Sequence, residues 1–117
     1  MKLASLALLS CAWIALAAAC GDDGVSRAVG ARCEAARDCD ERCLEPSNDS
    51  PGGFCTLSCE SSEACPSGAA CTDREGGVCL FTCAVLDDCA FLGPEWTCRE
   101  QDLRADQGIK VKVCLGV

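Results

Sequence analysis

The sequence predicts a small disulfide-rich protein: an N-terminal signal-peptide helix, then three tandem four-cysteine units with short β-hairpins and little other regular secondary structure. The 117-residue chain contains 14 cysteines, about an eighth of its residues. This fraction is above the roughly 8–10% that marks a disulfide scaffold in a short secreted chain. Aromatic residues make up only 4% of the chain, too few for a large apolar core, and domains of this size need covalent staples. Regular cysteine spacing is the third observation and defines the units.

The chain begins with an apolar segment, residues 1–19, that is typical of a secretory signal peptide. Lys2 supplies a minimal positive charge, and Ala17–Ala19 form a small-residue cleavage region. The alternative is a retained membrane anchor. It is disfavoured because the apolar run falls short of the ~20 residues that span a bilayer, and because the acidic sequence GDDG follows it. We therefore expect an exported protein.

Cys20 follows this leader directly and is the candidate lipidation site. The residues before it fit ordinary signal-peptidase cleavage and also resemble a bacterial lipobox, except that Ala17 stands where leucine is usual. Cleavage before Cys20 leaves an odd number of cysteines, so one must pair between chains, stay free or be modified. Lipid on Cys20 leaves an even set and makes the membrane the expected partner. The alternative is a soluble secreted protein with a free or intermolecular Cys20.

Residues 20–32 are interpreted as the lipidated cysteine and a flexible tether, because GDDGVSRAVGAR is polar, contains glycine and shows no hydrophobic period. Gly21 stands where an aspartate would resemble an inner-membrane retention signal. Its presence favours the bacterial outer membrane or the cell surface as the location.

From Cys33 onward the cysteines form three sets of four. The first two of each set are separated by five residues, and the last of one set and the first of the next by three residues. These intervals divide the chain into cysteine repeats at residues 33–58, 59–82 and 83–117. The predicted disulfide cysteines are Cys33, Cys39, Cys43, Cys55, Cys59, Cys65, Cys71, Cys79, Cys83, Cys89, Cys98 and Cys114.

The second half of each unit is expected to be a β-hairpin that carries the third and fourth cysteines. In the third unit, Ile109, Val111 and Val113 alternate with two lysines, which is the pattern of a half-buried strand. The preceding EWTCRE can pair with this strand, and AACTD can pair with GVCLF in the second unit. The glycine pairs Gly52-Gly53 and Gly76-Gly77 supply the positive φ that tight turns require.

Spacing alone does not fix the disulfide pairing. If each unit closes on itself, four cysteines allow three pairings. We favour the interlaced pairing, first with third and second with fourth, because it pins the loop to both hairpin strands. Bridges of this kind contribute roughly 2–4 kcal/mol each, which can replace a missing apolar core.

The spacing C-x5-C…GG-x-C-x3-C, with the embedded ACPSGAAC of the second unit, resembles the tandem cysteine-rich repeats of predicted bacterial lipoproteins. The resemblance covers residues 33–114, with the lipobox-like leader in front. It implies an extracytoplasmic, anchored, disulfide-stapled module with a binding or structural role at the cell surface, and it implies no particular chemistry.

Composition argues against catalysis and against nucleic-acid binding. The chain has no histidine, no G-x-S-x-G sequence and a net charge of −8, so the usual general base and a basic patch are both missing. We expect no catalytic residue, no cofactor and no metal, since C-x2-C spacing is absent. The acidic stretches Asp38–Asp40 and Asp87-Asp88 could attract calcium, but neither forms a D-x-D-x-D-G loop.

Binding by exposed loops is the remaining class, with a protein or a glycan as the expected kind of partner. Trp96 is a candidate anchor because tryptophan is enriched at binding hot spots. The alternative is that it packs against the neighbouring Cys89 or Cys98 bridge.

Leu44–Phe54, LEPSNDSPGGF, is a candidate binding loop, and its alternative is a plain connector. A soluble inhibitor or effector would act through such a loop.

Overall fold

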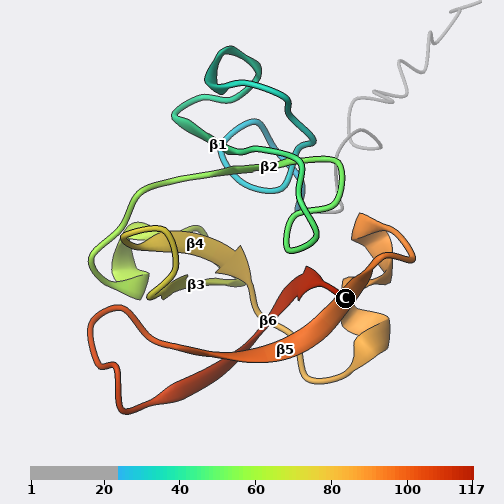
Figure 1. Ribbon diagram of the computed structural model, residues 1–117. Coiled ribbons are helices and arrows are strands. Elements are labelled where there is room, and N and C mark those ends of the chain that lie inside the picture. Colours follow the sequence, from blue (N-terminus) through green and yellow to red (C-terminus); the bar gives the residue numbers. More distant parts are fainter. Residues whose placement is uncertain (1–23) are drawn as a thin grey trace, which may run out of the picture.

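A computed structural model describes residues 24–117 (Figure 1). The signal peptide and the lipidation site Cys20 lie outside these residues. Within them, each unit has a 3₁₀ turn followed by an antiparallel two-stranded hairpin, so the predicted small disulfide-rich class is confirmed. The elements are η2 (Ala36–Asp38), β1 (Arg42–Leu44), β2 (Phe54–Thr56), η3 (Ser62–Ala64), β3 (Ala69–Thr72), β4 (Val78–Phe81), η4 (Leu86–Leu92), β5 (Trp96–Asp102) and β6 (Lys110–Gly116).

Six disulfides close the units over residues 24–117, and their pairing is the interlaced one that the sequence favours. Each first cysteine bonds the third and each second the fourth, giving Cys33–Cys43, Cys39–Cys55, Cys59–Cys71, Cys65–Cys79, Cys83–Cys98 and Cys89–Cys114. The third and fourth cysteines of a unit lie directly opposite each other across the hairpin. Opposed residues share one face of a sheet. Both bridges therefore leave the same face and clamp the 3₁₀ turn over it.

The glycine pairs have the expected positive φ, and the second glycine of each pair has a clear reason. Gly53 and Gly77 have φ of 81° and 109°, and a Cβ on either would collide with the carbonyl oxygen of the first cysteine of its unit. In the third unit the strand residue Lys112 occupies this place, and its carbonyl accepts a hydrogen bond from the Cys83 N–H at 3.0 Å. The third unit therefore manages without the glycine pair by lengthening its hairpin.

The three units share one hydrophobic core. Phe54 of β2 is fully buried, with its ring centroid 5.8 Å from that of Phe81 in β4 and 5.5 Å from that of Trp96 in β5. Phe91 of η4 continues the cluster, 5.3 Å from Phe81. Leu115 of β6 packs into the same cluster. Four aromatic side chains therefore join all three units into one body.

Backbone and side-chain hydrogen bonds reinforce this packing between units. Thr56 donates its hydroxyl to the Cys79 carbonyl at 2.6 Å. The Arg104 N–H bonds the Cys71 carbonyl at 3.0 Å, beside an isolated bridge between Thr72 and Leu103. The β3–β4 hairpin is thus hydrogen-bonded to the first unit along β4 and to the third unit along β3. Figure 1 shows β3 and β4 between the first unit and the long β5–β6 hairpin.

The described part of the expected tether is folded. Val29 is 1% exposed and belongs to the core. The Gly30 N–H bonds the Cys55 carbonyl at 2.8 Å, and the Cys55 N–H bonds the Ala31 carbonyl at 2.8 Å. The segment therefore pairs along β2, and the expectation of a flexible tether is wrong for residues 25–32. Val29 is a lone buried residue without periodic partners, so the sequence pattern does not distinguish this segment from a tether.

The long hairpin agrees with its predicted alternation except at one residue. Val113 is buried, Val111 is half-buried, and Lys110 and Lys112 are exposed. Ile109 is 50% exposed, because it precedes β6 and lies in the turn.

Removing the longest-range bridge should cost measurable stability. We expect the paired substitution Cys89→Ala and Cys114→Ala to lower the free energy of unfolding by about 2–5 kcal/mol, since this bridge spans 25 residues. Urea denaturation without reductant measures the change. Cys20→Ser is the matched control and should leave the midpoint unchanged. Equal midpoints for the two variants would contradict this assignment of the bridge.

Candidate functional site

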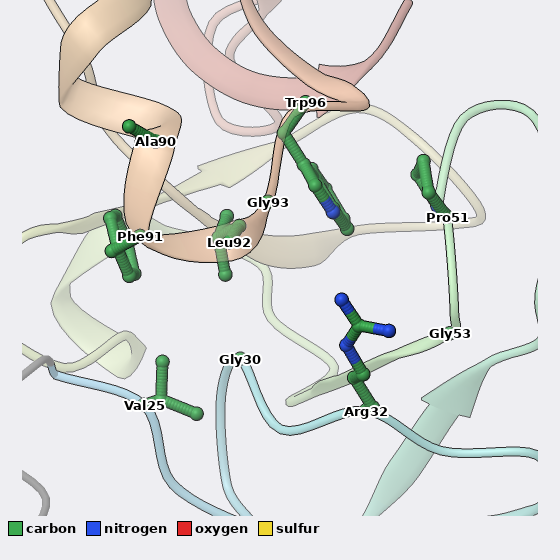
Figure 2. A pocket seen from close by; sticks show the side chains of 10 residues that line it. All are labelled: Val25, Gly30, Arg32, Pro51, Gly53, Ala90, Phe91, Leu92, Gly93 and Trp96. Atoms are coloured by element: carbon green, nitrogen blue, oxygen red, sulfur yellow. The ribbon is translucent and has the colours of Figure 1, made fainter.

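The candidate site is a pocket of about 230 Å³ between the start of the described chain and the end of η4 (Figure 2). Val25, Arg32 and Pro51 line one side. The opposite side is lined by Phe91, Leu92 and Trp96. The site thus exists only because the N-terminal segment and the first unit dock against the third unit.

Arg32 is the only charged residue that lines this pocket. Its side chain passes between two glycines: a Cβ on Gly52 would lie 3.2 Å from Nη1, and one on Gly93 would lie 3.6 Å from Nη2. The ion pairs among residues 24–117 involve four other arginines and Lys110. Figure 2 shows the guanidinium directed into the space below Trp96. The pocket therefore has an arginine that makes no ion pair with a carboxylate among residues 24–117.

Trp96 is largely a core residue. It is 4% exposed and packs on Phe54, so most of its surface serves the junction between the first and third units. One edge of the ring still faces the pocket, where a Cβ on Gly93 would lie 3.8 Å from Cδ1. Any binding role of Trp96 is therefore confined to this edge.

The candidate loop Leu44–Phe54 divides into an exposed tip and a fixed base. Residues 45–48 are exposed, whereas the Asp49 carboxylate pairs with Arg74 at 2.7 Å and with Arg99 at 3.2 Å. The Asp49 carbonyl also accepts from the Gly116 N–H at 2.8 Å. Asp49 thereby ties the first unit to the second and the third. No local pattern in the sequence marks Asp49, because its partners lie 25 and 50 residues away.

Three of the acidic candidates, Asp38, Asp40 and Asp88, are bound by groups of their own chain. The Asp38 carboxylate accepts from the N–H groups of Glu34 at 2.9 Å and Ala35 at 3.2 Å. These two hydrogen bonds hold the pKa of the Asp38 carboxyl below its usual value. Asp40 pairs with Arg27 at 3.5 Å. The carboxylates near η2 therefore face separate partners.

The same device recurs at η4. The Asp88 carboxylate accepts from the Ala84 N–H at 2.8 Å and the Val85 N–H at 3.1 Å, and these bonds lower the pKa of the Asp88 carboxyl. The residue before the second cysteine thus caps the turn of its unit. The second unit has Ala64 at this position.

Cysteine sulfur atoms cluster in each unit of the described residues. In each unit, three cysteine Sγ atoms lie within 4.8 Å of one another. All of these sulfurs belong to the disulfides. They are therefore the packed centres of the bridge pairs, and thiolate ligands would form only after reduction.

Comparisons with protein families, with curated proteins and with solved structures found no match to the chain. Within residues 24–117, none of the helices has the length and apolarity needed to cross a membrane. Six disulfides indicate an oxidising compartment for the domain.

Asp49 should contribute to stability through its two arginine pairs. We expect Asp49→Asn to lower the free energy of unfolding by about 1 kcal/mol, because half-exposed ion pairs are weak singly but here share one carboxylate. The loss should shrink in 1 M salt. Asp87→Asn, which removes an exposed carboxylate from η4, is the control. Equal urea midpoints for the two variants, at low and at high salt, would contradict the stabilising role of the Asp49 ion pairs.

The two capping carboxylates should make stability depend on acid pH. Because their folded-state pKa is depressed, their contribution is present above the unfolded value near 4 and is lost as pH falls through the folded value. We expect an Asp38→Asn, Asp88→Asn variant to be less stable than wild type at pH 7, and this difference should shrink as the pH is lowered toward 2. Urea midpoints of the variant and the wild type across this pH range measure the difference in stability. A pH-independent gap would overturn the capping role.

Proposed function

We propose that this chain is a lipid-anchored, exported module with a binding role at the bacterial cell surface. One observation supports the anchor above all others: the six bridges use every cysteine from Cys33 to Cys114. Cys20 therefore has no disulfide partner among them. A cysteine at the cleavage point of a secretory leader, outside a complete bridge set, is free to carry lipid.

The folded start of the domain sharpens this proposal. Gly24 is four residues after Cys20, a reach of at most about 14 Å for an extended chain. Val25 already lines the pocket. The lipid on Cys20 would hold the domain against the bilayer surface, so its partners would be met there.

Binding is favoured over catalysis because the chain offers a pocket with one arginine and an apolar wall but contains no histidine. We propose no catalytic residue and no cofactor. The soluble inhibitor or effector remains the alternative. Its binding loop would be reduced to the exposed tip at residues 45–48, because Asp49 fixes the base of the loop.

Mass spectrometry of the protein purified from bacterial membranes tests the anchor. We expect an N-terminal Cys20 that carries a diacylglyceryl group, and no free thiol. Cys20→Ser should move the protein from the membrane to the soluble exported fraction. Cys11→Ser, a cysteine substitution inside the leader, is the control and should leave membrane attachment intact. An unmodified amino-terminal Cys20 would overturn the proposal and favour the soluble alternative.

A further inference from the structure

We propose that the pocket between Arg32 and Trp96 binds a small carboxylate carried on an apolar group. This inference deepens the binding role proposed above and names its ligand class. It rests on that binding role and not on the lipid, because the pocket consists entirely of described residues.

Charge selects an anion. The chain carries a net charge of −8, yet the pocket is lined by one guanidinium and by no carboxylate. Asp49 neutralises Arg74 and Arg99, and Asp73 and Glu60 neutralise Arg104. Arg32 has no such pair within residues 24–117. A local positive site on an acidic molecule attracts small anions, and Arg32 presents such a site inside a pocket.

Hydrogen-bond geometry narrows the anion to a carboxylate. The planar fork of an arginine matches a carboxylate with two parallel N–H donors. Figure 2 shows the Trp96 indole nitrogen at the end of the ring that faces Arg32. The side-chain hydrogen bonds of residues 24–117 include none donated by this indole. One cation and one neutral donor suit a singly charged carboxylate better than a phosphate dianion.

The absence of a side chain at Gly93 keeps this space open. A Cβ there would lie 3.6 Å from Arg32 Nη2 and 3.8 Å from Trp96 Cδ1. The space over Gly93 is therefore within van der Waals range of both the Arg32 and the Trp96 side chains. A carboxylate entering over Gly93 meets the guanidinium on one side and the indole edge on the other.

The remaining wall selects an apolar body. Phe91 is 43% exposed although it packs on Phe81, and Val25 and Leu92 lie beside it in the pocket. A volume of about 230 Å³ is below the roughly 300–1,000 Å³ of pockets for drug-sized ligands. The ligand is therefore a small one, with about one apolar side group attached to its carboxylate.

Titration of the full exported chain carrying Cys20→Ser tests the proposal, since this variant keeps the pocket without the lipid. The probes are N-acetyl-phenylalanine and its C-terminal amide, followed by the Trp96 indole N–H resonance. We expect saturable binding of the acid and at least about tenfold weaker binding of the amide, because a charge-assisted hydrogen bond is lost. Equal binding of acid and amide, or no saturable shift, would overturn the proposal.

Two substitutions test the named residues. Arg32→Gln should weaken binding of the acid by about tenfold or more. Arg37→Gln is the matched control, since it removes the same charge from an exposed arginine that does not line the pocket. Phe91→Ala should weaken the binding of N-acetyl-phenylalanine more than it weakens the binding of acetate. Equal losses for the two arginine variants would reduce the effect to net charge and would overturn the assigned site.

A free small acid and the C-terminus of a peptide share this chemistry. Ala-Ala-Phe and its C-terminal amide form the second arm of the titration. Tighter binding of the tripeptide acid than of N-acetyl-phenylalanine identifies a peptide terminus as the source, and equal affinity identifies a small free acid. Either result is consistent with the carboxylate site. Tighter binding of the tripeptide amide than of the tripeptide acid would contradict that site. Loss of membrane attachment in Cys20→Ser with retained binding separates this test from the test of the anchor.

Discussion

The interlaced pair of disulfides in each unit is the constraint from which the rest of the structure follows. Third and fourth cysteines stand opposite each other in register, so both bridges leave one face of the hairpin and hold the preceding 3₁₀ turn against it. A two-stranded hairpin alone is marginal in water, and β1 and β2 have only three residues each. The bridges allow such short strands to persist. They also fix the spacing between units, because only three residues link the last bridge of one unit to the first of the next.

Bridges alone would leave three small units joined by short links. Two further interactions convert them into one body: the aromatic cluster centred on Phe54, and the Asp49 carboxylate shared by arginines of the other two units. Because Phe54 follows the loop that contains Asp49, one segment of the first unit carries both contacts. The pocket between Arg32 and Trp96 is a consequence of this docking, since its two sides come from different ends of the chain.

Local chemistry could be predicted from the sequence, and contacts between units could not. Cysteine spacing restricts the bridges because loop length and hairpin register are local, and alternation around Val113 marks a strand for the same reason. Val29 has no periodic partners, so its segment has the sequence pattern of a tether although it pairs along β2. The sequence allows Trp96 to be an exposed anchor or a packed residue, and the position of Phe54, distant in the sequence, places it in the core. Asp49 and Arg32 differ from other charged residues only through long-range neighbours, which spacing does not reveal.

The place of the pocket near the start of the folded chain joins the two proposals physically. Val25 lines the pocket and follows Cys20 by five residues, so a lipid there would hold the pocket near the bilayer surface. The excess of acidic residues would then keep the rest of the domain from adhering to anionic headgroups, while Arg32 remains available to a single carboxylate. If both proposals hold, the pocket would meet its apolar acid beside the bilayer, and its one guanidinium would match the single charge of that acid.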